Sequence, residues 1–293
     1  GSECLMRVVA GPVERVSVYS RPMPGPDGTV RTAFVPEDRF GNPGCFAEPA
    51  ACKLAWEDAT QSLTLDETAI LDLPAPSETA RARLSVPMHG LAANENIANG
   101  IRDGGTLLVT GNPVWPEGPE DLKAGFGEIH WHTEFSGDGQ RTIRDALQAA
   151  RDTLNMDFAA PGDHNPAGDK WADTVAVLDE FNDDDRFATF FGWEYSQRRG
   201  HENYYFPTSD HPLRADTRRG FDGVEREDVP EHLRKVYAEA DFITIPHHTN
   251  AVAETRRLED DVPFWHPYKW GEPTAHLRLV EIFQARGNQE RNV

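Results

Sequence analysis

Residues 127–139, GEIHWHTEFSGDG, hold two imidazoles and a carboxylate close together in the sequence. One residue separates His130 from His132, so in an extended strand both side chains leave the same face. Asp138 follows between two glycines. Two imidazoles on one face can share one metal ion. This stretch alone is equally consistent with a strand that merely carries two histidines and with the opening of a metal site, so the rest of the chain has to decide.

Residues of the types that bind metals also close later apolar runs. In parallel β/α units the carboxyl ends of the strands meet at one end of the sheet, so polar residues there are expected to converge. We expect a multinuclear metal site built by several segments. Its further candidates are Asp163 and His164 after 156–160, Glu194 in 186–196, and His247 and His248 in 241–248.

The elements that must position these residues alternate between strand and helix. Apolar runs of strand length are followed by segments with helical spacing, a pattern that predicts parallel β/α units. The expected helices are 142–154, 174–182 and 231–240. The expected strands are 127–132, 156–160, 186–196, 202–207, 241–248 and 277–287.

The first part of the chain has a different pattern. Short alternating runs lie between turn signals such as PGPDG and RFGNPG, which predicts an all-β, sandwich-like domain. The connector 113–125 is rich in proline and glycine, and we place the boundary there. The expected domains are 1–118 and 119–293.

Composition limits the possible partners. Lys and Arg number 29 against 49 Asp and Glu, a formal net charge of −20, which argues against nucleic-acid binding. A small or oligomeric anionic substrate stays possible because bound cations reverse the local field. No apolar run reaches the length of a membrane span. A cytoplasmic location is favoured, and export stays open because a signal peptide could have been removed.

The motifs resemble those of the polymerase-and-histidinol-phosphatase (PHP) superfamily over roughly residues 125–290. GEIHWHTEFSGDG resembles the first motif, NMDFAAPGDHN the second and GWEYSQRRGHENYYF the third. ITIPHHT stands where the fourth motif usually has His-Pro. With its β-rich first part, the chain is similar to a branch of large PHP-like proteins of unknown function.

The resemblance implies an α/β fold, in which a distorted (β/α)7 PHP-type barrel follows the β-sandwich. It also implies two or three divalent ions, Zn²⁺, Mn²⁺ or Fe²⁺, with Glu194 bridging two of them. Either His247 or His248 could be the ligand of the fourth motif. The implied catalytic residues are Glu194, Asp163 and His248, with Asp163 orienting a ligand. The implied metal ligands are His130, His132, Asp138, His164, Glu194, His201 and His247.

The implied activity is metal-dependent hydrolysis, with a phosphoesterase favoured and a metal-bridging hydroxide as nucleophile. The alternatives are a hydrolase or lyase acting on a non-phosphate bond, such as one in an acidic carbohydrate, and a catalytically silent binding module. The family's last Asp-x-His motif is missing after Glu281. We therefore expect a fragment, or a further segment or partner chain that completes the site. The expected substrate-binding cations are Lys170, Arg198, Arg199 and Arg286.

Overall fold

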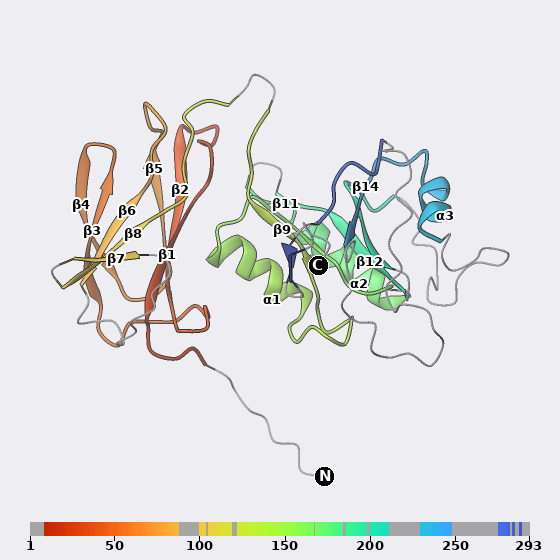
Figure 1. Ribbon diagram of the computed structural model, residues 1–293, viewed down its shortest axis with the longest axis horizontal. Helices are drawn as coiled ribbons and strands as arrows, with labels where there is room; N and C mark the ends of the chain where they lie inside the picture. The colour runs from red at the N-terminus through yellow and green to blue at the C-terminus, as the bar shows by residue number, and fades with distance from the viewer. Residues whose placement is uncertain are drawn as a thin grey trace, which may run out of the picture. The chain divides into compact units, whose positions relative to one another are not determined.

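Figure 1 shows the computed structural model of the chain. By its internal contacts the chain forms two compact units, the first made of Gly1–Gly127 with Gln148–Asp157 and the second of Glu128–Leu147 with Phe158–Val293. The structure describes residues 9–87, 100–103, 105–118, 122–166, 168–183, 186–197, 200–210, 229–247, 275–281, 283–284 and 287–288.

The first unit extends beyond residue 118 to Gly127, and it also includes the later segment Gln148–Asp157. That piece is held by hydrogen bonds, because Asn155 Nδ2 donates to the carbonyls of Tyr19 at 3.2 Å and Arg31 at 2.8 Å. Asp157 accepts a hydrogen bond from the backbone N–H of Phe126 at 2.8 Å. These contacts pair residues that lie far apart in sequence, so a search for linkers could not reveal them.

Eight described strands build two antiparallel sheets in the first unit, in the orders β1-β2-β5 and β4-β3-β6-β8-β7. Both sheets contribute to one apolar core, which includes Phe34 from β2 and Leu54 from β3. A short π-helix, η2 (Ala149–Thr153), belongs to the returning segment. The strands are β1 (Arg15–Ser20), β2 (Thr29–Glu37), β3 (Ala50–Trp56), β4 (Ala59–Leu65), β5 (Ala69–Pro74), β6 (Arg83–Pro87), β7 (Gly100–Asp103) and β8 (Thr106–Thr110).

The second unit contains two three-stranded sheets and a short two-stranded ribbon. Their orders are β11-β10-β9, β12-β13-β14 and β15-β16. The helices are α1 (Ile143–Gln148), α2 (Asp169–Phe181) and α3 (Val229–Val236). The strands are β9 (Gly127–Trp131), β10 (Phe158–Pro161), β11 (Ala188–Thr189), β12 (Phe191–Gln197), β13 (Gly200–Phe206), β14 (Ile243–His247), β15 (Phe283–Gln284) and β16 (Gly287–Asn288).

The α/β class and the (β/α)7 barrel expected from the sequence are wrong. The described residues are 41% strand and 15% helix, with three α-helices, and four of their sheets are antiparallel. The connection from β12 to β13 shows the physical reason. Only residues 198–199 separate these strands, whereas a parallel crossover needs a dozen residues or more. β12 and β13 therefore pair antiparallel.

Membrane crossing by a helix finds no support within the described part of the chain. None of its helices combines the length and the apolar character that a bilayer span requires.

Candidate metal centre

The register of the β12-β13-β14 sheet gathers three functional side chains. His201 on β13 lies directly opposite His247 on β14 and opposite Ser196 on β12. Directly paired residues project from the same face of a sheet, and residues two apart on one strand share that face. Glu194 therefore lies on the face that carries His201 and His247.

The segment after β10 is tied to β12 by backbone hydrogen bonds. Glu194 N–H donates to the Asp163 carbonyl at 2.9 Å, and Asn165 N–H donates to the Glu194 carbonyl at 2.8 Å. His164 and Glu194 form a parallel β-bridge at this point. The bridge places the ring of His164 beside the carboxylate of Glu194.

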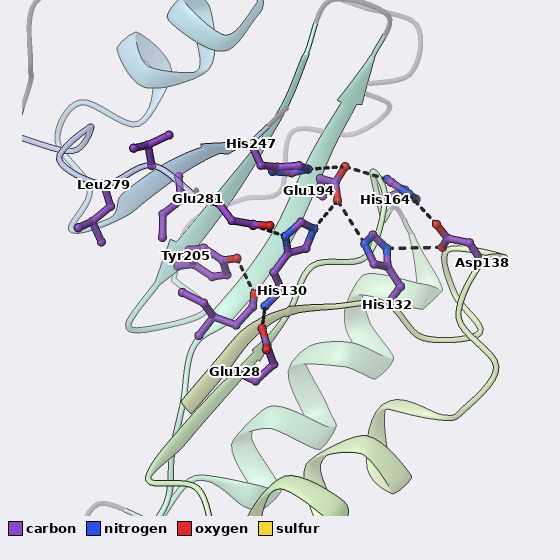
Figure 2. Close-up of a pocket in the computed structure, with 13 residues that line it drawn as sticks. Glu128, His130, His132, Asp138, His164, Glu194, Tyr205, His247, Leu279 and Glu281 are labelled. Carbon is purple, nitrogen blue, oxygen red and sulfur yellow. Dashed lines mark hydrogen bonds and ion pairs between the residues drawn. The ribbon is translucent and has the colours of Figure 1, made fainter. Parts of the chain in front are cut away.

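Five histidines converge on the carboxylate of Glu194, whose side chain is fully buried. Figure 2 shows four of them, His130, His132, His164 and His247. His201 Nδ1 makes the closest contact, with Oε1. His164 Nδ1 and His247 Nε2 also face Oε1, at 3.2 and 3.4 Å. His130 Nε2 and His132 Nε2 face Oε2, at 3.2 and 3.4 Å. Segments that are distant in sequence thus meet at one side chain.

Asp138 supplies a second carboxylate at the edge of the cluster. Its Oδ2 lies 3.0 Å from His164 Nε2, and its Oδ1 lies 3.5 Å from His132 Nδ1. The loop that carries it needs glycine at two points. Gly137 has φ +85°, and a Cβ at Gly139 would lie 2.3 Å from the His132 carbonyl oxygen. These glycines let the loop fold back onto the strand end.

Asp163 holds this loop and does not itself contact a histidine ring. Its carboxylate accepts hydrogen bonds from the backbone N–H and the hydroxyl of Thr133, both at 2.7 Å. It also accepts one from the Ser136 hydroxyl at 2.7 Å. The Ser136 oxygen in turn accepts the His164 N–H at 2.8 Å and lies 3.2 Å from His132 Nδ1. Asp163 thus fixes the backbone that carries two of the histidines.

The cluster opens into a cavity of about 680 Å³ (Figure 2). Part of the lining is apolar, formed by Ile129, Ile245, Leu279 and Val280 with the ring of Tyr205. Glu281 also lines the cavity, and its Oε2 lies 2.5 Å from His130 Nδ1. The sequence prediction omitted Glu281 from the site. The sequence holds only a weak signal, because Glu281 is a single carboxylate within the otherwise apolar run LVEIF.

The cluster shifts the protonation of its members. Burial disfavours the Glu194 anion, but the close contacts with the surrounding histidines outweigh burial and hold its pKa well below the usual range. Burial also opposes charging of His130, yet its contacts with Glu194 and Glu281 raise its pKa to about 9. Burial lowers the pKa of His247 and of His132. Glu194 is therefore an anion at neutral pH, as a ligand for cations must be.

The donor set fits divalent metal ions. His130, Glu194 and His247 offer ligand atoms within 4.8 Å of one another, and so do His132, His164 and Glu194. Glu194 belongs to both groups. Although Glu194 Oε1 and His164 Nδ1 lie 3.2 Å apart, both are buried and neither has a hydrogen bond of acceptable geometry. Lone pairs held this way suit a cation between them, and mixed N and O donors suit Zn²⁺, Mn²⁺ or Fe²⁺.

Not every candidate residue lies in this cluster. The Lys170 ammonium donates to the Phe135 carbonyl at 2.8 Å and is not among the described residues that line the cavity. Four further candidates, His248, Arg198, Arg199 and Arg286, lie outside the described residues.

The comparison with protein families identifies the chain only at the level of a family. Residues 140–293 match the model of the family described as "Protein of unknown function (DUF3604)". The match spans more than half of the chain, and the chain therefore belongs to this family. No curated protein and no solved structure matches it.

Proposed function

We propose that this protein is a metal-dependent hydrolase and that a phosphate ester is its preferred substrate. The observation that carries the proposal is the convergence of five histidines on the buried carboxylate of Glu194. Burying a carboxylate costs free energy unless partners of opposite charge surround it. The resemblance of the sequence motifs to PHP enzymes supports the same class.

Glu194 would hold two cations together, with His130 and His247 completing one set of ligands and His132 and His164 the other. Bound divalent cations would acidify a water molecule and neutralise charge that develops on substrate oxygen atoms. The protein's own part is orientation. Ser196 Oγ lies 3.1 Å from His201 Nε2, which leaves His201 Nδ1 facing Glu194. Asp163 fixes the loop that carries His132.

The cavity separates two parts of a substrate. The reacting group would lie against the histidines, and the remainder would contact the wall that includes Leu279 and Val280. Leu279 is 53% exposed and Val280 39% exposed, so apolar surface is available to a ligand there.

The test starts from protein stripped with a chelator and reloaded separately with Zn²⁺, Mn²⁺ or Fe²⁺. Phosphate monoesters and diesters are then assayed with and without chelator. We expect turnover that depends on the added metal and is lost with chelator. Metal-independent turnover, or no metal binding by folded protein, would contradict the proposal.

A second candidate function is hydrolysis or elimination at a non-phosphate bond, such as one in an acidic carbohydrate. The charge of the cavity favours a reacting bond that carries no charge of its own, because the described lining residues include Glu128, Asp138, Glu194 and Glu281 but no lysine or arginine. A phosphate group would then be bound by the metal cations alone, without help from a lysine or arginine among the described lining residues. Turnover of carboxylate-bearing sugar oligomers, with none of phosphate esters, would select this candidate.

A further inference from the structure

Glu281 contacts the His130 ring on the side that faces away from Glu194. Its Oε2 lies 2.5 Å from His130 Nδ1, while His130 Nε2 lies 3.2 Å from Glu194 Oε2. The two nitrogens of one imidazole are thus each matched to a different carboxylate (Figure 2). Glu281 is absent from both groups of atoms that could surround a cation. Glu281 thus contacts a candidate metal ligand, His130, without belonging to the candidate ligands itself.

The backbone holds Glu281 in this place. Thr244 on β14 forms a parallel bridge with Leu277, and Thr244 N–H donates to the His276 carbonyl at 2.9 Å. Glu281 N–H donates to the Pro246 carbonyl at 3.2 Å. The segment 276–281 therefore runs alongside β14. His247, at the end of β14, and Glu281 thus approach the histidine cluster from adjacent stretches of backbone. The Glu281 side chain is only 19% exposed.

We propose that Glu281 is a positioning residue that fixes the ring orientation and tautomer of His130 for metal binding. A carboxylate that accepts the Nδ1 proton leaves the Nε2 lone pair directed at the metal and makes the imidazole a stronger ligand. Loss of such a partner typically weakens metal affinity about 10–100-fold. The inference rests on the proposed function, because it requires His130 to be a metal ligand.

The test measures Zn²⁺ affinity of the stripped full chain by competition with a chromophoric chelator. Glu281→Met keeps the length of the side chain but removes both acceptor oxygens, and we expect about 10–100-fold weaker binding. Glu281→Gln keeps an acceptor without the charge, and its affinity should lie between those of Glu281→Met and the wild type. Equal affinities for all three proteins would overturn the proposal.

Glu128→Gln is the matched control for charge. Glu128 lines the same cavity, but its Oε1 accepts the backbone N–H of His130 at 2.8 Å and does not contact the ring. A glutamine keeps that acceptor, so Zn²⁺ affinity should stay within about twofold of the wild type if orientation of the ring matters. A loss as large as that of Glu281→Met would show that cavity charge alone is responsible and would overturn the positioning role.

Separate readouts distinguish this inference from the proposed function. If Zn²⁺ binds and Glu281→Met weakens it while no substrate turns over, the positioning role holds and hydrolysis fails. If metal-dependent turnover is observed but the Glu281 variants bind Zn²⁺ like the wild type, hydrolysis holds and the positioning role fails. Absence of Zn²⁺ binding by the folded wild type would overturn both.

Discussion

Glu194 is a buried carboxylate with no lysine or arginine partner among the described contacts. Its described ion-pair partners are all histidines. Neutral imidazoles cannot balance a buried charge, and several protonated ones would repel each other within the cluster. Cations shared between Glu194 and the histidines resolve both difficulties.

Glu194→Gln should therefore reduce turnover more than alanine at any one histidine of the cluster. The amide keeps the shape of the side chain but removes the charge that both groups of ligands share. We expect a loss beyond the roughly 100-fold that partners of ligands contribute. Steady-state assays of the metal-loaded variants test this, with circular dichroism as the check on folding. Near-normal turnover of Glu194→Gln beside an inactive His132→Ala would exclude the shared role.

Cys52 makes stability depend on pH. Burial raises the pKa of its thiol from 9.0 to about 11. The unfolded chain then loses this proton before the folded chain does. The contribution of this thiol to the free energy of unfolding is therefore complete below about pH 9, and it is lost as the pH rises towards 11. Urea unfolding at pH 8, 9.5 and 11 should show this decline.

Cys45 provides the control for this prediction, because it is a free and exposed cysteine. Cys52→Ala should reduce the alkaline decline, whereas Cys45→Ala should leave it unchanged. An identical decline in both variants would assign the effect to other groups.

At the level of single residues, much of the cluster that the structure brings together could be predicted from the sequence. His130 and His132 were recognisable because alternation in a strand fixes their common face. His164, Glu194 and His247 were recognisable because each follows or closes an apolar run. Glu281 was missed because one carboxylate within an apolar run has no motif, and its meaning depends on a contact with a residue 151 positions away.

At the level of elements, most strands were expected near their observed places. The antiparallel pairing of β12, β13 and β14 was not expected. Period-two patterns locate a strand without fixing the direction of its neighbours. The connection between β12 and β13 was short enough to indicate a hairpin, but the alternation of strands and helices elsewhere favoured parallel units. The residues of the site converge nonetheless, because the register of β13 and β14 aligns His201 with His247.

Glu202 on β13 ties α3 to the sheet through the face opposite the histidines. The Arg234 guanidinium donates to Glu202 Oε1 at 2.8 Å and to Oε2 at 3.0 Å, and Thr244 also donates to Oε1. Glu202 is fully buried. Arg234→Ala would leave this charge without its cation and should destabilise the protein by about 3–5 kcal/mol.

Urea unfolding measures that loss, and Arg144→Ala is its control. Arg144 pairs with Glu180 at 2.5 Å, but their side chains are 49% and 57% exposed, so its removal should change stability little. Equal effects of the two substitutions would refute the importance of burial.

Asp163→Asn tests the loop that carries His132. The amide cannot accept all three hydrogen bonds that the carboxylate accepts from Thr133 and Ser136 with the same strength. We expect Zn²⁺ affinity to fall about 10-fold or more, as for other partners of ligands. Competition with a chelator measures the change. Unaltered affinity would show that the loop keeps its geometry without this charge.

At the scale of the whole molecule, the division into two units predicts a selective response to metal. All candidate ligands belong to the second unit. Metal at 100 times its dissociation constant should stabilise that unit by about 2.7 kcal/mol. Calorimetry should then resolve two transitions, of which metal raises only one. Glu194→Gln should abolish most of the rise, and an equal shift of both transitions would contradict the assignment.

The returning segment Gln148–Asp157 has a consequence for how the chain is made. A ribosome releases the chain from its amino end, and domains generally fold as their last residue becomes free. Here the first unit lacks Asn155 and the two carbonyl contacts that it makes until the first strand of the second unit and α1 have already emerged. At usual elongation rates that wait is on the order of a few seconds. During it β9, with His130, is already synthesised, so a strand of the second unit emerges before the first unit is complete.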